Sequence, residues 1–384
     1  MPESIGTPGP TLGVVGGGQL GRMMAEAAAP LGVELIVLDP TPDPPAAPVS
    51  RDTITADFDD EDAMRELAER SDALTFEIEL ADPDLLERVG EAADIPVHPS
   101  PDTLRTIEDK LVQKRELRDA GIPVPPFHPV HEPDDLHEAV EEFDSVMLKA
   151  RTGGYDGRGN VPVTDADEAT EAFEVVGGAA MAETFVDFDR EISVIGVKGA
   201  NEIATFPIGE NVHEEEILRE TIVPSRSADG VEERAREVAR DVLELLDGRG
   251  VYGIELFEVD GDVLLNEIAP RPHNSGHWTI EGALTSQFEQ HVRAVLGWPL
   301  GATDRRATTV TANILGDVDE PEPATLYGVD RALSADGVSL HWYGKEEVRP
   351  LRKMGHITAV EADASPDTVL DRARTIRDEL TFTP

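Results

Sequence analysis

The chain has 384 residues, of which 78 are acidic and 33 are basic, and its formal net charge is -45. This balance argues against binding to nucleic acid or to an anionic membrane, and fits an acidic, strongly hydrated surface of the kind that halophilic proteins carry. Hydrophobic residues make up 40% of the chain, which excludes general disorder, and the absence of cysteine excludes disulfides and thiolate chemistry.

The length predicts two or three domains. No apolar run approaches the ~20 residues of a membrane-spanning helix, and the first ten residues differ from a signal peptide. We therefore expect a soluble, cytoplasmic enzyme. The sequence contains only six lysines, so each of them is a candidate for a position that needs a positive charge: Lys110, Lys114, Lys149, Lys198, Lys345 and Lys353.

Residues 12–39 predict a strand, a glycine-rich turn over 16–21, a helix and a second strand that ends at Asp39. A Gly-x-Gly-x-x-Gly turn before a helix can bind an anion, and Asp39 lies where a dinucleotide fold places its ribose-binding acid. NAD, another phosphate, or a tight turn without a ligand all fit this pattern. Further helices (61–70, 82–91) and strands (73–76, 95–97) predict a small doubly wound sheet that ends near residue 100, with Glu77 and Glu79 at its ligand-binding edge.

A single helix is predicted over 101–120, followed by a proline-rich linker. A strand over 146–150 carries Lys149 and leads into the glycine-rich stretch 151–160, RTGGYDGRGN. Backbone amides of such a loop, together with Lys149 and Arg158, favour phosphate binding over a loop that is merely flexible. Strands over 181–186, 190–197 and 202–208 come next, and a loop over 211–215 holds His213, where a lone histidine is more often incidental.

The sequence is organised around residues 252–278, YGIELFEVDGDVLLNEIAPRPHNSGHW, which predict a β-hairpin after an amphipathic helix over 230–246. A two-residue turn at Asp260-Gly261 would place Glu255 opposite Asn266, whereas a three-residue turn would pair Glu255 with Glu267. Two facing carboxylates with an amide oxygen suit Mg²⁺ that carries phosphates, although an exposed hairpin with solvated acids is the plainer alternative.

A helix over 281–296 is predicted next, and a small domain from about residue 301 follows. Its predicted strands cover 309–314, 338–342 and 356–360, and its helix covers 365–379. Two lysines and two arginines gather in 343–345 and 349–356, and such a basic patch suits a substrate phosphate.

Four stretches together resemble the ATP-grasp superfamily, and closely the 5-(carboxyamino)imidazole ribonucleotide synthetases of purine biosynthesis. They are GGGQLGRM (16–23), GGYDGRGN (153–160), NEIAPRPHNSGH (266–277) and RKMGH (352–356). The resemblance implies an α/β chain with a Rossmann-like pre-ATP-grasp domain (1–100), an ATP-grasp domain (101–300, flap subdomain about 122–187) and a small β-rich C-terminal domain (301–384). It also implies a homodimer.

The implied reaction is an ATP-dependent carboxylation. Bicarbonate attacks the γ-phosphate to give carboxyphosphate and ADP, and the exocyclic amine of 5-aminoimidazole ribonucleotide then takes the carboxyl group. A second ATP-grasp ligase, such as a formate-dependent glycinamide ribonucleotide transformylase, is the nearest alternative. A dinucleotide oxidoreductase and a silent nucleotide-binding module are the others.

The resemblance also implies roles for individual residues, with Mg²⁺ held by Glu255 and Glu267. The implied catalytic residues are Asp156 as general base, Arg271 for bicarbonate or carboxyphosphate, and Lys345. The implied ribonucleotide ligands are Glu77, Tyr155, Arg158, Lys345 and Arg352. The implied ATP ligands are Arg105, Lys149, Gly154, Tyr155, Asp156, Gly157, Arg158, Gly159, Asn160, Glu183, Thr184, Phe185, Val186, Glu191, His213, Asn266 and Glu267. One departure is Leu351, where the family is expected to carry a small residue, often glycine.

Overall fold

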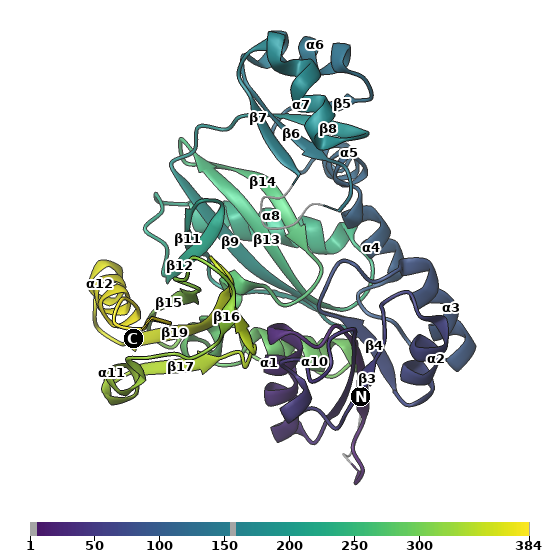
Figure 1. The fold of residues 1–384 in the computed structure, drawn as a ribbon, viewed down its shortest axis with the longest axis vertical. Helices are drawn as coiled ribbons and strands as arrows, with labels where there is room; N and C mark the ends of the chain where they lie inside the picture. The colour runs from purple at the N-terminus through teal and green to yellow at the C-terminus, as the bar shows by residue number, and fades with distance from the viewer. Residues whose placement is uncertain (1–5, 154–158, 384) are drawn as a thin grey trace.

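The computed structural model describes residues 6–153 and 159–383. Figure 1 shows a small sheet with two helices at the top, a long sheet in the middle, and the N-terminal sheet beside the C-terminal strands at the bottom. Within the described ranges, no helix is both long and apolar enough to cross a membrane. The predicted mixture of helices, parallel strands and antiparallel strands is confirmed.

The N-terminal region is a four-stranded parallel sheet in the order β3-β2-β1-β4. Alternate side chains of β1 face opposite sides: Leu12 and Val14 pack against α1 and α10, whereas Val15 packs against α2 and α3. The predicted strand over 95–97 is wrong, because only a single bridge joins Val97 to Leu74. The elements are β1 (Thr11–Val15), α1 (Gln19–Ala28), η1 (Ala29–Leu31), β2 (Glu34–Asp39), η2 (Ala47–Val49), β3 (Asp52–Thr55), α2 (Glu61–Glu69), β4 (Ala73–Phe76) and α3 (Pro83–Ala93).

The helix predicted over 101–120 is two helices, α4 (Pro101–Glu108) and α5 (Lys110–Asp119). Asp109 separates them, because its backbone is extended and its carboxylate accepts hydrogen bonds from the amides of Leu111 and Val112. An aspartate in this role begins a new helix. The break therefore separates the direction of α5 from that of α4, and α5 carries two of the six lysines.

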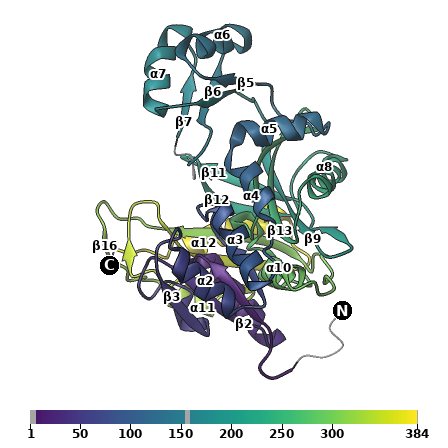
Figure 2. The ribbon, with the colours of Figure 1, turned by 90° about the vertical axis from the view of Figure 1, so that its right-hand side faces the viewer.

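The upper region in Figures 1 and 2 is a four-stranded antiparallel sheet in the order β5-β8-β6-β7. Helices α6 and α7 pack on it through Leu136, Val140 and Ala172. Strand β8 ends at Thr184, two residues earlier than the predicted strand. The elements are β5 (Phe127–Val130), α6 (Pro133–Phe143), β6 (Val146–Ala150), β7 (Asn160–Val163), η3 (Ala166–Glu168), α7 (Ala169–Val176) and β8 (Ala180–Thr184).

The central sheet is antiparallel, with the strand order β14-β13-β9-β11-β12-β15-β19-β17, and β10 pairs with β9. His213 lies in β11 and not in the expected loop. The helix predicted over 281–296 is also divided, because Ser286 caps the second helix by accepting from the amide of Glu289. The elements up to this point are β9 (Arg190–Lys198), β10 (Ile203–Thr205), β11 (Gly209–Glu214), β12 (Ile217–Val223), α8 (Val231–Leu245), β13 (Gly250–Val259), β14 (Asp262–Ala269), η4 (Asn274–Gly276), α9 (Thr279–Gly282) and α10 (Gln287–Val295).

The C-terminal strands continue this central sheet, because β15 pairs with β12 from Glu220↔Ala312 to Val223↔Thr309. A reciprocal pair of amides adds a second link, with Asn274 and Asn313 joined by hydrogen bonds of 3.1 and 2.9 Å. The remaining elements are β15 (Thr308–Leu315), β16 (Glu322–Pro323), α11 (Val329–Ser334), β17 (Val338–Trp342), β18 (Glu347–Val348), β19 (Lys353–Glu361) and α12 (Pro366–Arg377).

Candidate active site

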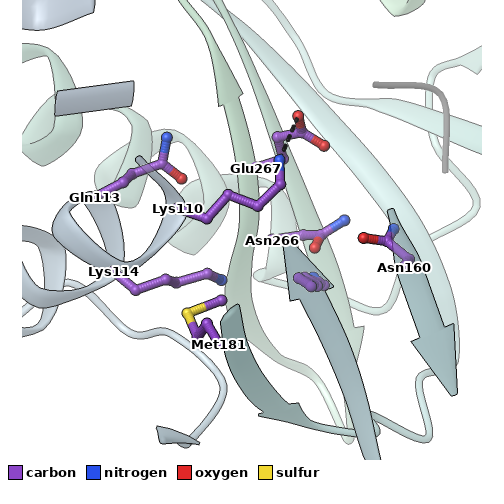
Figure 3. A pocket seen from close by; sticks show the side chains of 8 residues that line it. Lys110, Gln113, Lys114, Asn160, Met181, Asn266 and Glu267 are labelled. Atoms are coloured by element: carbon purple, nitrogen blue, oxygen red, sulfur yellow. Dashed lines mark ion pairs between the residues drawn. The ribbon is translucent and has the colours of Figure 1, made fainter. Parts of the chain in front are cut away.

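A pocket lies where α5, the upper sheet and the hairpin β13–β14 meet (Figure 3). Figure 3 shows Lys110 reaching toward Glu267, and the nearest atoms of this ion pair are 3.9 Å apart. The sequence predicted four of the lining residues as site residues and missed the others on α5 and β8. The lining residues are Lys110, Gln113, Lys114, Lys149, Asn160, Met181, Asn266 and Glu267.

Two lysines share one buried carboxylate beside this pocket. Nζ of Lys149 lies 2.6 Å from Glu183, and Nζ of Lys114 lies 2.7 Å from the other oxygen of the same carboxylate. Burial opposes the charge on Glu183, but the two ammonium groups outweigh it and lower the pKa of this carboxyl group. The cluster places two lysines against one carboxylate at the pocket wall, which suits a phosphate, although burial lowers the pKa of Lys114.

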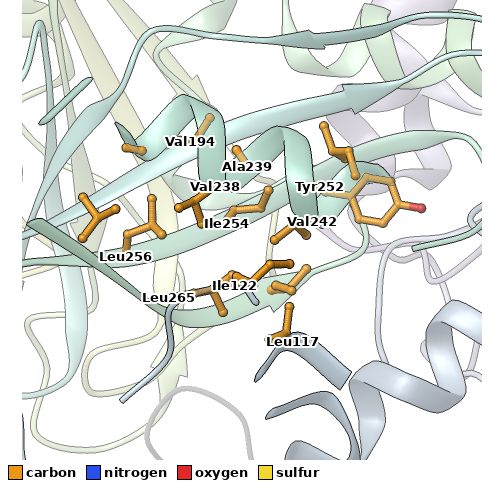
Figure 4. Packing of buried hydrophobic residues seen from close by; sticks show 14 of the residues in the cluster. Leu117, Ile122, Val194, Val238, Ala239, Val242, Tyr252, Ile254, Leu256 and Leu265 are labelled. Atoms are coloured by element: carbon orange, nitrogen blue, oxygen red, sulfur yellow. The ribbon is translucent and has the colours of Figure 1, made fainter. Parts of the chain in front are cut away.

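Helix α8 decides which face of the hairpin carries the site. Figure 4 shows Val238 and Val242 of α8 against Ile254 and Leu256 of β13. Alternate residues of a strand face opposite sides, so burial of these two apolar neighbours turns Glu255 toward the other face of the sheet. The hydrophobic core thus positions the carboxylate.

The hairpin pairs Glu255 with Glu267, but it does so with a two-residue turn and not with the three-residue turn on which this pairing was expected to depend. Val259 pairs with Asp262, so the turn is the two residues Asp260 and Gly261, with φ angles of 51° and 84°. Such positive φ angles are typical of the mirror-image turns that favour hairpins. A β-bulge corrects the register instead: Glu255 faces Glu267 and Leu256 faces Leu265, which leaves Asn266 as the extra residue.

The environment of Glu255 is unusual for a carboxylate. Its side chain is 20% exposed, and burial raises its pKa to about 7. The negative charges of Glu267 and Glu191 raise this pKa further, whereas positive charge on His213 and Lys353 opposes the shift. A bound cation would relieve the repulsion between the two facing acids.

The hairpin donors fit magnesium, since Glu255, Glu267 and the amide oxygen of Asn266 are all hard oxygen ligands. In the described part of the chain, no group of three or more His, Asp or Glu side chains could hold a metal alone. Magnesium often takes only one or two carboxylates and completes its shell with water and substrate phosphates. The two acids would therefore hold Mg²⁺ together with a nucleotide.

The raised pKa of Glu255 predicts that Mg²⁺ affinity depends on pH. Below about pH 7 the folded protein protonates Glu255 and loses a negative charge, so affinity should fall by up to about tenfold per pH unit. Above this value the affinity should level off. Calorimetric titration of Mg²⁺ with a non-hydrolysable ATP analogue, at about pH 6 and about pH 8, measures this. Glu255→Gln should bind weakly at both pH values; equal wild-type affinities would contradict the prediction.

His213 lies on the same face as Glu255 and is not incidental. Its Nδ1 contacts the carboxylate of Glu191 on the neighbouring strand β9. Burial disfavours the imidazolium ion, but the hydrogen bond and charge of Glu191 outweigh it and raise the pKa of His213. The structure therefore brings both of these predicted residues to the hairpin carboxylates.

The glycine-rich turn is satisfied by the chain's own carboxylates. The amides of Gly18 and Gly21 donate to Glu77, the latter over 2.5 Å, and the amide of Gly17 donates to Asp39 over 2.8 Å. Burial raises the pKa of Glu77, although these hydrogen bonds oppose the shift. The amide donors that a dinucleotide would need are thus occupied, which removes the support for an oxidoreductase.

Arg271 joins this N-terminal edge to the hairpin. Its Nε lies 2.9 Å from Glu79, and its side chain is 19% exposed. Burial disfavours the guanidinium ion, but the charges of Glu79, Glu77 and Glu267 outweigh it and raise the pKa of Arg271. A permanent cation therefore lies between the two groups of acids.

Arg105 is not brought to the pocket. Its guanidinium group pairs at the surface with Asp84 (2.6 Å), Glu87 (2.5 Å) and Asp102 (2.6 Å). Lys110, at the start of the next helix, lines the pocket instead. Two of the three acids that hold Arg105 come from α3, a contact that sequence spacing alone does not reveal.

The basic C-terminal patch is only partly as predicted. Lys345 donates to the carbonyl of Lys353 over 2.7 Å, and Arg352 donates to the carbonyl of Glu347 over 2.6 Å. Lys353, which was counted in the basic patch but not among the site residues, lies close enough for its charge to oppose the rise in the pKa of Glu255 and to contribute to the lowered pKa of His273. The small number of lysines in the sequence, six in all, was the feature that could have pointed to Lys353 as a site residue.

Leu351 occupies a left-handed backbone position, with φ 61°, and is 37% exposed. This conformation costs a side-chain-bearing residue about 1–2 kcal/mol, and glycine regains part of it at an entropic cost of about 0.5–1 kcal/mol. Leu351→Gly is therefore expected to raise the free energy of unfolding by up to about 1 kcal/mol. Urea denaturation measures it; a loss of more than about 1 kcal/mol would contradict the prediction.

The remaining predicted residues follow β8 or belong to the glycine-rich loop. Thr184 is the last residue of β8. Phe185, which is 54% exposed, and Val186 come directly after it. Gly159 has φ 85° and leads into Asn160 at the start of β7. Five predicted residues lie outside the described part of the chain: Gly154, Tyr155, Asp156, Gly157 and Arg158.

Three family models match the chain: the ribonucleotide synthetase preATP-grasp domain over residues 10–108, the ATP-grasp domain over 115–288, and the phosphoribosylaminoimidazole carboxylase C-terminal domain over 309–366. The N5-carboxyaminoimidazole ribonucleotide synthase of Brucella melitensis is 42% identical over 92% of this chain and 97% of its own length. The Bacillus subtilis enzyme of the same name is 39% identical over 93% of both chains. The chain belongs to the N5-carboxyaminoimidazole ribonucleotide synthase family.

Solved structures of this family have the same fold. The Thermotoga maritima N5-carboxyaminoimidazole ribonucleotide synthetase is 39% identical, with a TM-score of 0.87 over 97% of this chain and 99% of that one. The Aspergillus clavatus enzyme, in complex with ADP and 5-aminoimidazole ribonucleotide, is 35% identical, with a TM-score of 0.87 over 97% and 99%. Membership of the N5-carboxyaminoimidazole ribonucleotide synthase family confirms the predicted ATP-grasp fold.

Proposed function

We propose that the chain catalyses the ATP- and bicarbonate-dependent carboxylation of the exocyclic amine of 5-aminoimidazole ribonucleotide, with release of ADP and phosphate, in purine biosynthesis. The observation that carries this proposal is the pairing of Glu255 with Glu267 beside a pocket lined by Lys149. The relative solved with ADP and 5-aminoimidazole ribonucleotide supports the choice of substrate.

The residues divide the chemistry between them. Glu255 and Glu267 would hold Mg²⁺, which, when bound, neutralises charge on the transferring phosphoryl group. The excess positive charge of the Lys114–Glu183–Lys149 cluster would hold the ATP phosphates. Bicarbonate oxygen attacks the γ-phosphorus and ADP leaves, which forms carboxyphosphate.

The second half of the reaction would use the other side of the site. Arg271, fixed by Glu79, would hold bicarbonate and then carboxyphosphate through charge-assisted hydrogen bonds. The amine takes the carboxyl carbon, its proton passes to a base that we assign to Asp156, and phosphate departs. Lys345, Arg352 and Glu77 would anchor the ribonucleotide, together with Tyr155 and Arg158.

We also propose a cytoplasmic homodimer that works in concentrated salt. The formal charge of -45 supports the last point, because salt screens the repulsion among surface acids and between the surface and anionic substrates. The substrates are small molecules, and neither nucleic acid nor a membrane is expected as a partner.

The test is ADP release in high-KCl buffer with Mg²⁺-ATP and bicarbonate, with and without 5-aminoimidazole ribonucleotide. We expect release that depends on the ribonucleotide and is matched by an acid-labile, ¹⁴C-carboxylated product. Release with glycinamide ribonucleotide and formate would transfer the chain to the sibling ligase. Folded protein that turns over neither pair would refute both assignments.

A further inference from the structure

Three histidine rings are stacked at the junction between the hairpin loop and the C-terminal strands. His356 of β19 is wholly buried, and its ring lies 4.4 Å from that of His341 and 4.8 Å from that of His277, with interplanar angles of 16° and 29°. His277 and His356 belong to two of the stretches that carry the family resemblance. The proposed mechanism uses none of the three rings.

Each ring of the stack is fixed by a polar contact to a different element. Nε2 of His341 lies 2.7 Å from the carboxylate of Glu281 on α9, and Nδ1 of His277 lies 3.3 Å from the amide nitrogen of Gln287 on α10. Nδ1 of His356 lies 2.9 Å from the hydroxyl of Tyr343. The stack is therefore held at both ends and cannot slide.

Tyr343 connects the histidine stack to Lys345, which is proposed to bind the ribonucleotide. It is 1% exposed and packs in the core cluster formed by α1, α10 and the N-terminal sheet. Nζ of Lys345 lies 5.7 Å from the centroid of the Tyr343 ring, a cation–π contact, and donates to the carbonyl of Lys353. Gly344 turns the chain with φ 77°, close to Arg22 at the start of α1.

A buried tyrosine hydroxyl needs a hydrogen-bond partner, and a lysine side chain needs contacts that limit its rotamers. His356 is the hydrogen-bond partner of the Tyr343 hydroxyl, and the ring of Tyr343 provides one of the contacts of Lys345. Nε2 of His356 has no hydrogen-bond partner among the described residues. The contact between Nδ1 of His356 and the Tyr343 hydroxyl is therefore the one hydrogen bond of this ring among the described residues.

We propose that His356 is a positioning residue: the stack with His277 and His341 fixes its ring, its hydrogen bond fixes Tyr343, and the ring of Tyr343 fixes the ammonium group of Lys345 for the ribonucleotide. This inference rests on the proposed function, in which Lys345 binds the ribonucleotide. His356 itself does not touch the reacting atoms.

The primary test is Tyr343→Phe, which removes a single oxygen atom and keeps the ring, with His356→Leu as the second variant. Both should raise KM for 5-aminoimidazole ribonucleotide by about two- to tenfold, the effect of one hydrogen bond, and leave kcat and KM for ATP nearly unchanged. The double variant should be no worse than the more impaired single variant, because both changes break the same contact. His356→Asn, whose side-chain amide can donate to or accept from the Tyr343 hydroxyl near the position of Nδ1, should recover part of the loss.

His291→Leu is the matched control, because His291 is also wholly buried and hydrogen-bonded, to Thr75 and the amide of Val251, but lies outside the stack. It should lower the melting temperature without a change in KM for the ribonucleotide. Tyr343→Phe alone decides the matter if His356→Leu fails to fold. An unchanged KM for the ribonucleotide, additive effects, or an equal rise in KM for ATP would overturn the inference.

Lys345→Met separates the inference from the proposed function. If Lys345→Met raises KM for the ribonucleotide and Tyr343→Phe does not, the positioning role fails and the proposed function stands. If Lys345→Met has no effect while active wild-type enzyme carboxylates the ribonucleotide, the assigned role of Lys345 fails, and with it the route from His356 through that lysine.

Discussion

Glu267→Gln is expected to lower kcat by on the order of a hundredfold or more, with ADP release as the measurement. The substitution keeps the shape of the side chain and removes the charge that faces Glu255 across the hairpin. A magnesium ion contributes several kcal/mol of charge stabilisation during phosphoryl transfer, and Glu267 is one of only two carboxylates proposed to hold it. Lys110, 3.9 Å from Glu267, is a cation and cannot replace the lost ligand.

The fold should survive this change, because the side chain of Glu267 is 56% exposed and its charge raises the pKa of Glu255. The melting temperature without Mg²⁺ should therefore stay the same or rise slightly. Asp262→Asn is the matched control: it makes the same change of charge on the same strand, but at the turn, where the side chain is 88% exposed. Activity of Glu267→Gln within a few fold of wild type would refute the metal assignment.

Lys149→Met is expected to lower kcat/KM for ATP by about 10²- to 10³-fold, because it removes the ammonium group assigned to the ATP phosphates. The usual risk of such a change is an uncompensated buried charge. Here Glu183 keeps Lys114 as a partner at 2.7 Å, so the protein should remain folded. Thermal denaturation and steady-state kinetics separate the two effects.

Two further lysine variants sharpen this test. Lys114→Met leaves Glu183 paired with Lys149 alone, so the excess positive charge disappears and kcat/KM for ATP should also fall, by a smaller factor. Lys198→Met is the control, because Lys198 donates to the carbonyl of Leu246, away from the pocket. If Lys149→Met folds and turns over ATP normally, the phosphate assignment is wrong.

Local pattern predicted most of the elements, because the apolar spacing of each segment matches the face that it buries. The strands over 73–76, 146–150 and 338–342 end where expected. Two of the errors fall at helix breaks, where a capping side chain at Asp109 or Ser286 outweighs a continuous helical pattern. Helix propensity alone does not predict whether an aspartate inside a helical pattern ends one helix and caps the next.

The site shows the same limit. The pairing of Glu255 with Glu267 was expected, but the bulge that produces it has no signature in the residue types around Asn266. Arg352 was predicted as a ribonucleotide ligand, whereas Lys353 was named only as part of the basic patch. Strand β19 begins at Lys353, so the position of this side chain depends on where the strand starts, which residue types alone do not fix.

The bulge at Asn266 determines which insertions and deletions in this hairpin keep Glu255 and Glu267 on the same face. Five residues (256–260) separate Glu255 from the middle of the turn, and six residues (261–266) separate it from Glu267. The extra residue, Asn266, forms the bulge and brings the two carboxylates to the same face of the sheet. A loop lengthened at Asp260-Gly261 keeps both carboxylates on one face as long as Val259 still pairs with Asp262. A single residue inserted or deleted within a strand, between Glu255 and Val259 or between Asp262 and Glu267, separates them unless the bulge moves or vanishes. Single-residue changes should therefore be confined to the turn at Asp260-Gly261, or be offset by a change in the bulge at Asn266.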